Sequence, residues 1–294
     1  MKFLLISILI FTLLLSGCTA EEAPAQIAAT TLPVYEFTSR LCDGTGITVS
    51  RLVTENVSCL HDYSLNVRQV KAAEAAEVIV ISGAGLEEFM DDILHNKAVI
   101  DASEGIDLLE TSTVHEHEHE HAHDHDHSHE EDPHIWLSPV NAKSMAINIC
   151  AGLCEQYPAH SDIFEQNLSL LIADLDALEA YGQAQLSPLR HHDLITFHDG
   201  FGYFAEAFGL QILEAVEEES GSEASAQELK HLITVVREHD LPAIFIEING
   251  SVSAADVISR ETGTKVYALD MAMSGDSYFD AMYRNIDTIK EALG

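Results

Sequence analysis

Eight histidines stand at every second position from His115 to His129, and glutamate or aspartate fills most of the positions between them. Imidazole is a ligand for Zn²⁺, Cu²⁺ and Ni²⁺, and the acidic neighbours add local negative charge. Such a segment cannot bury a core, so we expect a loop that captures metal weakly and transiently. A merely solvated polar insert is the alternative, and it does not explain the strict alternation. The predicted auxiliary ligands are His115, His117, His119, His121, His123, His125, His127 and His129.

Three further histidines stand in short motifs of their own. His61 lies in CLHDY, His134 in DPHIW and His198 in FHDG, while Asp270 follows an apolar run in ALDM. Most isolated histidines in a protein bind nothing. Three imidazoles and one carboxylate are nevertheless a ligand set that Zn²⁺ accepts. These four residues are therefore the candidates for one metal site.

The rest of the chain predicts the elements that would position these side chains. Short apolar runs alternate with helical patterns, which is typical of α/β proteins with mostly parallel sheets. Four strands are predicted before the middle of the chain and four after it, at 26–30, 47–53, 78–82, 98–101, 194–197, 211–215, 243–248 and 265–269. Loops at the carboxyl ends of such strands carry function, so we expect a ligand in the cleft between two lobes.

A long helix is predicted between the two sets of strands. Its apolar residues are spaced four and three apart, from Phe164 to Leu178. Two shorter helices are predicted at 225–238, where Ser225 and Glu228 form a capping-box pattern, and at 277–293. The predicted organisation is a signal peptide at 1–17, a tether at 18–25, an N-terminal lobe at 26–157 containing the histidine-rich loop, a rigid linking helix at 158–187 and a C-terminal lobe at 188–294.

The N-terminus carries an export signal. One lysine precedes an apolar run from Phe3 to Leu15, which is shorter than the roughly 20 residues that span a bilayer. The run ends in Leu-Ser-Gly-Cys, which closely resembles a bacterial lipobox and marks Cys18 as the lipidated residue. An ordinary signal peptide with an incidental cysteine is the alternative. We expect a protein anchored by lipid to the outer face of the cytoplasmic membrane.

Four more cysteines follow Cys18. An exported location permits disulfides, and a bond between Cys42 and Cys59 would need their Cα atoms within about 7 Å. Cys150 and Cys154 are helix neighbours, for which buried thiols are expected.

The charge balance excludes two classes of partner. Lys and Arg number 14 against 49 Asp and Glu, a net charge of −35 with neutral histidines. Nucleic acids and anionic membrane surfaces are bound through clustered Lys and Arg, so neither is an expected partner. The 47% of hydrophobic residues supplies a core and excludes wholesale disorder.

The sequence resembles the zinc-type members of the cluster A-I metal-binding proteins of ABC transporters. The matching stretches cover nearly the whole mature chain in the family's order: HDY at 61–63, VIVISGAGLEE at 78–88, DPHIWLSP at 132–139, FHDGFGY at 197–203, FIEI at 245–248, ETG at 261–263 and DSY at 276–278. Two features depart from the commonest pattern, namely Cys59-Leu60 before His61 where proline is usual, and Met271-Ala272 after Asp270 where Pro-Leu is usual.

The resemblance implies four metal ligands, two from each lobe: His61, His134, His198 and Asp270. Manganese-type relatives usually carry a carboxylate where His198 stands, so the ligand set favours Zn²⁺ over Mn²⁺. Cu²⁺ and Ni²⁺ follow zinc as less favoured ions in the cell, although they can bind nitrogen ligands as tightly in vitro. Around the site, Trp136 would pack as a neighbour, and Asp199 or Glu247 would orient a ligating imidazole.

The implied function is that of a monomeric zinc-binding protein, not an enzyme, that delivers Zn²⁺ to an ABC permease. Two other functions stay open at this point. An exported zinc hydrolase would need an open water position and a general base, for which Glu247 or Asp199 could serve. A surface adhesin or a zinc-storage lipoprotein would bind metal without serving uptake.

Overall fold

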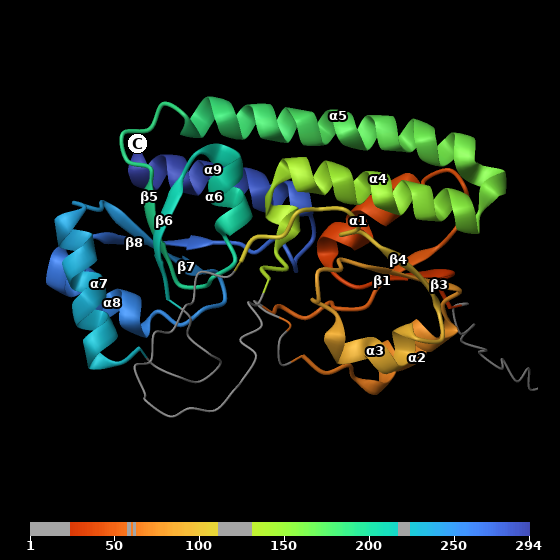
Figure 1. The fold of residues 1–294 in the computed structure, drawn as a ribbon, viewed down its shortest axis with the longest axis horizontal. Helices are drawn as coiled ribbons and strands as arrows, with labels where there is room; N and C mark the ends of the chain where they lie inside the picture. The colour runs from red at the N-terminus through yellow and green to blue at the C-terminus, as the bar shows by residue number, and fades with distance from the viewer. Residues whose placement is uncertain (1–23, 58–59, 61–62, 111–130, 217–223) are drawn as a thin grey trace, which may run out of the picture.

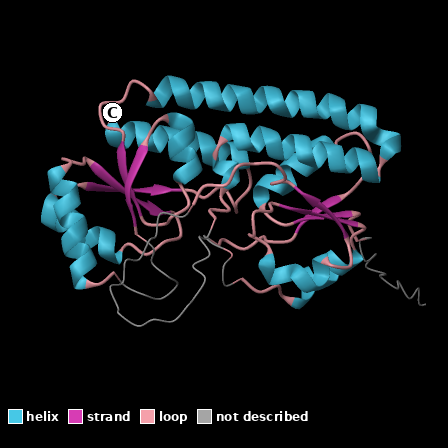
Figure 2. Ribbon diagram, in the orientation of Figure 1, coloured by secondary structure: helices cyan, strands magenta, loops and turns pink. Residues whose placement is uncertain are grey.

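The computed structural model describes residues 24–57, 60, 63–110, 131–216 and 224–294 (Figure 1). The described residues form two four-stranded sheets, each parallel throughout, with the strand orders β2-β1-β3-β4 and β6-β5-β7-β8 (Figure 2). The strands are β1 (Ile27–Ala29), β2 (Val49–Arg51), β3 (Val78–Ile81), β4 (Ala98–Asp101), β5 (Asp193–Thr196), β6 (Gln211–Ala215), β7 (Ala243–Glu247) and β8 (Lys265–Leu269). All eight predicted strands are confirmed, with ends that differ by at most two residues.

Helices cover both faces of each sheet, which is why the central strands are apolar without alternation. In β1, Ile27 and Ala29 pack toward one face and Ala28 toward the other; in β7, Phe245 and Ile244 divide in the same way. The helices of the N-terminal lobe are α1 (Leu32–Leu41), α2 (Val67–Ala75), α3 (Asp91–Leu94) and α4 (Pro139–Gln156). Those of the C-terminal lobe are α6 (Gly202–Phe208), α7 (Ala226–Glu238), α8 (Ser253–Thr262) and α9 (Tyr278–Leu293) (Figure 1).

Helix α5 (Ser161–Leu186) lies across both lobes (Figure 1). Its 26 residues span about 39 Å at the rise of an α-helix. The predicted apolar stripe faces inward, with Phe164, Leu171, Leu175 and Leu178 fully buried. A 3₁₀ turn (Pro158–His160) precedes it, within the range predicted for the linking helix. The helix packs on α4, α9 and α1, so elements of both lobes share it as a support.

Ion pairs fasten α4 to α5. The ammonium group of Lys143 donates to Asp176 and to Glu179 at 2.8 Å each. On the same helix α5, Gly182 allows the Phe208 ring of α6 to approach, because a Cβ at that position would stand 2.1 Å from a ring carbon. The C-terminal half of α5 is therefore held to α4 by charge and to α6 by close packing.

The capping box predicted at Ser225 and Glu228 is confirmed. Ser225 accepts from the Glu228 backbone N–H while the Glu228 carboxylate accepts from Ser225, so α7 begins with a complete capping box. Ser277 caps α9 by accepting from Asp280. These local signals explain why both helices begin within a residue of the predicted position.

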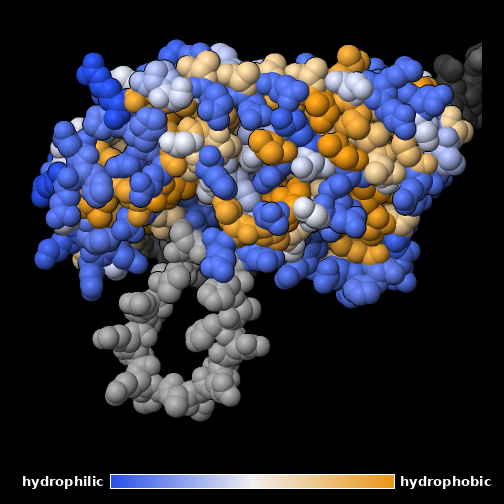
Figure 3. All heavy atoms as spheres, turned by 45° about the horizontal axis from the view of Figure 1, so that its top comes forward, coloured by the Kyte–Doolittle hydropathy of each residue, from blue (hydrophilic) through white to orange (hydrophobic). Residues whose placement is uncertain are grey.

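The main hydrophobic core continues through both lobes. It includes Ile27 and Phe37 from the N-terminal half together with Phe204, Phe245 and Tyr278 from the C-terminal half. The face of the molecule in Figure 3 mixes hydrophilic side chains with apolar ones.

Three thiols lie in the described part of the chain. Cys42 and Cys150 are buried and Cys154 is half-buried, and all three are free, as expected for the helix pair. Burial raises the pKa of Cys42 and of Cys150 to about 12, so both stay protonated. Cys59 lies outside the described residues, as do the signal sequence and Cys18. No described helix is long and apolar enough to cross a membrane.

Candidate metal centre

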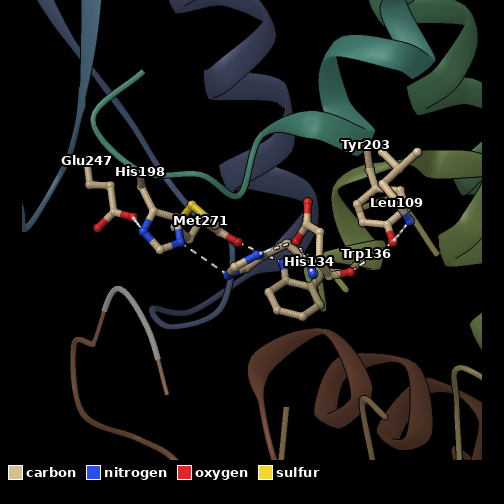
Figure 4. A network of polar contacts seen from close by, with 8 residues as sticks. Leu109, His134, Trp136, His198, Tyr203, Glu247 and Met271 are labelled. Atoms are coloured by element: carbon tan, nitrogen blue, oxygen red, sulfur yellow. Dashed lines mark hydrogen bonds and ion pairs between the residues drawn. The ribbon is translucent and has the colours of Figure 1, made fainter. Parts of the chain in front are cut away.

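His134 and His198 converge between the two lobes. His134 directly precedes a 3₁₀ turn (Ile135–Leu137) at the start of α4, and His198 follows β5. Their Nε2 atoms lie 3.3 Å apart, although the residues are 64 positions apart in the chain. The two rings are nearly perpendicular, at 86°, with centroids 5.0 Å apart (Figure 4). The structure thus brings together two of the four predicted ligands, one from each lobe.

Asp132 fixes the orientation of His134. Its carboxylate oxygen Oδ1 lies 2.7 Å from Nδ1 of the imidazole and also accepts from the His134 backbone N–H at 2.9 Å. Both residues are almost completely buried. Because a carboxylate can only accept, Nδ1 carries the proton and Nε2 presents its lone pair.

Glu247 faces His198 in a looser contact. This carboxylate is the last residue of β7, which is the sheet neighbour of β5, and it is buried. Its Oε1 atom lies 3.4 Å from Nδ1 of His198 (Figure 4). The arrangement directs Nε2 of His198 toward Nε2 of His134. Carboxylates behind the ligating imidazoles are the usual support of a protein metal site.

The floor between the two imidazoles is closed by Gly200 and Met271. A Cβ at position 200 would stand 2.7 Å from the His198 ring, 2.7 Å from the Met271 methyl group and 2.9 Å from Nδ1 of His134. Only glycine allows the two rings to meet at this point. Trp136 completes the wall: its ring packs edge-to-face on His134 at 5.4 Å, and its N–H donates to the Met271 carbonyl at 2.8 Å.

Asp270 is held by other partners in the structure. Its Oδ1 accepts from the Ala272 N–H at 2.9 Å, and its Oδ2 lies 3.4 Å from an Arg284 guanidinium nitrogen. The backbone of Asp270 exchanges two hydrogen bonds with the Asn285 side chain. Within the described ranges, no three His, Cys, Asp or Glu side chains come close enough to hold a metal ion together. His61 and the residues of the histidine-rich loop lie outside those ranges, so the four-ligand set stays a prediction.

Three side chains near the site were not among the predicted site residues. Asp132 could have been found, because a carboxylate two positions before a candidate ligand can reach its ring. Met271 and Tyr203 carry no such local signal. Of the predicted neighbours, Trp136 contacts His134 and Glu247 contacts His198. Asp199, the next residue after His198, is buried, and its role in orienting an imidazole stays a prediction.

The N-terminal sheet carries a buried carboxylate in the equivalent place, near the carboxyl ends of β1 and β3. There the Glu87 carboxylate, fully buried, accepts from the Thr30 hydroxyl at 2.6 Å, from the Ser82 N–H at 2.8 Å and from the Gly83 N–H at 3.0 Å. Burial raises the pKa of Glu87 to about 7, although these hydrogen bonds oppose the shift. The nearby Thr31 hydroxyl pairs with that of Ser82 at 2.8 Å.

Comparison with known proteins points to one family. Residues 27–292 match the family described as "Zinc-uptake complex component A periplasmic". The high-affinity zinc uptake system protein ZnuA of Bacillus subtilis is 31% identical over 281 residues, which cover 91% of this chain and 87% of that protein. The zinc-binding lipoprotein AdcA of Streptococcus pneumoniae is 28% identical over 96% of this chain, which spans 58% of that protein's length.

The fold agrees with this relationship. A crystal structure of ZnuA superposes with a TM-score of 0.78 at 30% identity, covering 92% of this chain and all of that one. Two parallel sheets, a long helix across both lobes and a histidine from each lobe are thus found together with a family match over almost the whole chain. The chain belongs to the family of periplasmic A components of zinc-uptake complexes.

Proposed function

We propose that this protein captures Zn²⁺ outside the cytoplasm and delivers it to an ABC-type membrane permease. The observation that carries the proposal is the 3.3 Å separation of the His134 and His198 Nε2 atoms, each backed by a carboxylate at Nδ1. Two nitrogens bound to one tetrahedral Zn²⁺ at about 2.0–2.1 Å lie about 3.3–3.4 Å apart. The pair is therefore already spaced for one zinc ion.

The ligand chemistry supports zinc as the cargo. Two neutral imidazoles suit Zn²⁺, whereas Mn²⁺ prefers oxygen ligands. The relatives named above are a zinc uptake protein and a zinc-binding lipoprotein. Ni²⁺ and Cu²⁺ also bind imidazole well, so selectivity in the cell would depend on geometry and on metal supply.

The complete proposed site adds His61 and Asp270 to the two histidines. To bind the metal, the Asp270 carboxylate would have to give up its contacts with the Ala272 N–H and with Arg284. Otherwise a water molecule would be the fourth ligand. Since zinc is satisfied by three protein ligands plus water as well as by four, both arrangements serve capture. The histidines at 115–129 would bind further ions weakly and feed the tight site.

The membership of a transport family, not of an enzyme family, argues against the hydrolase alternative. Growth of a deletion strain in zinc-poor medium distinguishes zinc uptake from the adhesin and storage alternatives. Deletion of the gene should impair growth there, and added zinc should restore it. Normal growth and normal zinc uptake in the deletion strain would contradict the proposal.

The proposed location is the outer face of the cytoplasmic membrane, with lipid on Cys18 as the anchor. The proposal rests on the lipobox-like sequence and on the lipoprotein name of one relative. Radioactive palmitate labelling of the native protein and of a Cys18→Ala variant tests it: label should be lost in the variant, and equal labelling would contradict the anchor.

Calorimetric titration with Zn²⁺ tests the binding site directly. We expect one tight site and several weak ones in the intact protein, loss of the tight site in His134→Ala, and loss of only the weak sites when 115–129 is deleted. His160→Ala is the matched control, because that ring packs beside Phe164 at the start of α5. Loss of the tight site on deletion of the loop would overturn the assignment. Parallel titrations with Mn²⁺, Ni²⁺ and Cu²⁺ measure selectivity.

A further inference from the structure

Two tyrosine hydroxyls donate hydrogen bonds to the segment that carries His134, one on each side of the histidine. The Tyr203 hydroxyl donates to the carbonyl of Asp132 at 2.8 Å, two residues before the histidine. The Tyr278 hydroxyl donates to the carbonyl of Trp136 at 2.8 Å, two residues after it. Tyr203 belongs to α6 and Tyr278 begins α9, so both come from the C-terminal half of the chain.

Tyr203 also joins residues 109 and 132, which lie on either side of segment 111–130 in the sequence. Its hydroxyl oxygen accepts from the Leu109 N–H at 2.9 Å (Figure 4). The Asp132 N–H donates to the Leu109 carbonyl at 2.8 Å, and Glu110 and Glu131 form an antiparallel bridge. One phenol thus fixes residue 109 and residue 132 at once, next to the carboxylate that orients His134.

Tyr278 holds the other side of the segment from a rigid position. Its side chain is fully buried, packs edge-to-face on Phe37 of α1 at 5.1 Å, and its backbone N–H donates to the Glu36 carboxylate at 2.6 Å. Trp136 adds a third hydrogen bond across the lobes through the Met271 carbonyl. Burial raises the pKa of both tyrosines, that of Tyr203 to about 12, so both hydroxyls remain protonated donors.

We propose that Tyr203 and Tyr278 are positioning residues that hold the His134 segment, 132–136, on the C-terminal lobe and so keep its imidazole in register with His198. The inference rests on the proposed zinc capture and deepens it. The alignment of the two ligands depends on hydrogen bonds from one lobe to the other lobe's ligand segment. His134 is in this way fixed to the C-terminal half of the chain before zinc binds.

In both tyrosines the hydroxyl makes the hydrogen bond to the His134 segment, so a Tyr→Phe substitution removes that bond and keeps the ring. Tyr203→Phe keeps the packing but leaves the Asp132 carbonyl and the Leu109 N–H without this partner. Tyr181→Phe is the matched control: its hydroxyl donates to Asp287 at 2.6 Å, between α5 and α9 on the exposed side of the molecule.

Zinc affinity by chelator competition, the rate of zinc loss to excess chelator, and the thermal midpoint of the metal-free protein are measured for each variant. We expect Tyr203→Phe and Tyr278→Phe each to weaken zinc binding and speed zinc loss by about 10-fold, the lower end of effects measured for groups that support metal ligands. Tyr181→Phe should stay within about twofold of the original protein.

A nitrogen NMR spectrum of the metal-free protein separates positioning from general stability. In Tyr203→Phe the imidazole signals of His134 should shift, while those of His160 should not. A lower thermal midpoint with unchanged zinc affinity and unchanged His134 signals would overturn the inference and leave the proposed function standing. Absence of tight zinc binding in the unmodified protein would instead refute the function. If Tyr278→Phe does not fold, Tyr203→Phe decides alone.

Discussion

The strand order reverses between β1 and β3 in the N-terminal sheet and between β5 and β7 in the C-terminal sheet. A reversal of this kind opens a crevice at the carboxyl ends of the strands, where α/β proteins bind ligands. Each crevice here contains a buried carboxylate, Glu87 in one and Glu247 in the other. Glu87 accepts hydrogen bonds from three donors of its own lobe, whereas Glu247 faces the imidazole of His198.

The difference shows that the topology supplies a place for a ligand but does not decide what occupies it. In the N-terminal crevice a hydroxyl and two backbone N–H groups saturate the carboxylate, so the group stabilises the ends of β1 and β3. In the C-terminal crevice the neighbour is a titratable ring with a second nitrogen available for metal. The N-terminal lobe accordingly presents His134 from the segment before α4 and not from its sheet.

Of the changes that test this comparison, the largest effect on zinc is expected at Glu247 in the C-terminal crevice. Glu247→Gln replaces the anion at Nδ1 of His198 by a neutral amide, which is a weaker acceptor and can turn its NH₂ group toward the ring. We expect zinc affinity to fall about 10- to 100-fold. Chelator competition measures the change. The control is Glu214→Gln, which alters an exposed glutamate paired with His231 at 2.9 Å on the same lobe; an equal loss in both variants would contradict the role of Glu247.

The corresponding change in the N-terminal crevice should affect stability and not zinc. Thr30→Val removes a hydroxyl that donates to a buried carboxylate, a bond for which about 1.5–3 kcal/mol of stability is typical. Urea unfolding should show that loss, with zinc affinity within about twofold of the original. Thr38→Val is the control, since the Thr38 hydroxyl is buried with no hydrogen-bond partner among the described residues. Its replacement should be neutral or stabilising, and a loss as large as that of Thr30→Val would assign the effect to shape alone.

The last prediction concerns pH. Burial raises the pKa of Glu87 from 4.5 to about 7, so the folded state binds more protons than the unfolded state between those values. The free energy of unfolding contributed by Glu87 is therefore highest below about pH 4.5, falls as pH rises through this window and becomes constant above about 7. Between pH 4 and 8, the free energy of unfolding of the metal-free protein should fall more steeply with rising pH than that of the Glu87→Gln variant.

Comparing the pH curves of the original protein and of Glu87→Gln removes the contribution of other groups whose pKa is raised, because those groups are the same in both proteins. Glu36, whose pKa is also raised by burial, is present in both proteins. Parallel curves for the original protein and Glu87→Gln would contradict the prediction.

Much of this architecture could be predicted from local pattern. The apolar runs 78–81 and 243–247 are buried on both faces, so their composition alone indicates central parallel strands. Ser225 and Ser277 mark helix starts through short-range hydrogen bonds that a sequence displays directly. His134 and His198 were assigned to one site from their short motifs and from the family resemblance, but no local pattern indicates a 3.3 Å approach between residues 64 positions apart.

What the sequence did not reveal is long-range in every case. The hydrogen bond from Tyr278 to Trp136 joins residues 142 positions apart, and that from Tyr203 to Asp132 joins residues 71 apart. An aromatic residue near the start of a helix reads as core packing, and both tyrosines are indeed buried. Their hydroxyl contacts depend on how the lobes are set against each other, which periodicity does not encode.

The contact between Tyr278 and Glu36 has a consequence for the order of folding. It joins positions 242 residues apart, and Arg51 similarly donates to the Gly275 carbonyl 224 residues away. Closing loops of that length slows folding, because their entropy is lost before the contacts are gained. During synthesis the first sheet emerges long before α9, so the side of α1 that Tyr278 covers stays open until α9 has been made.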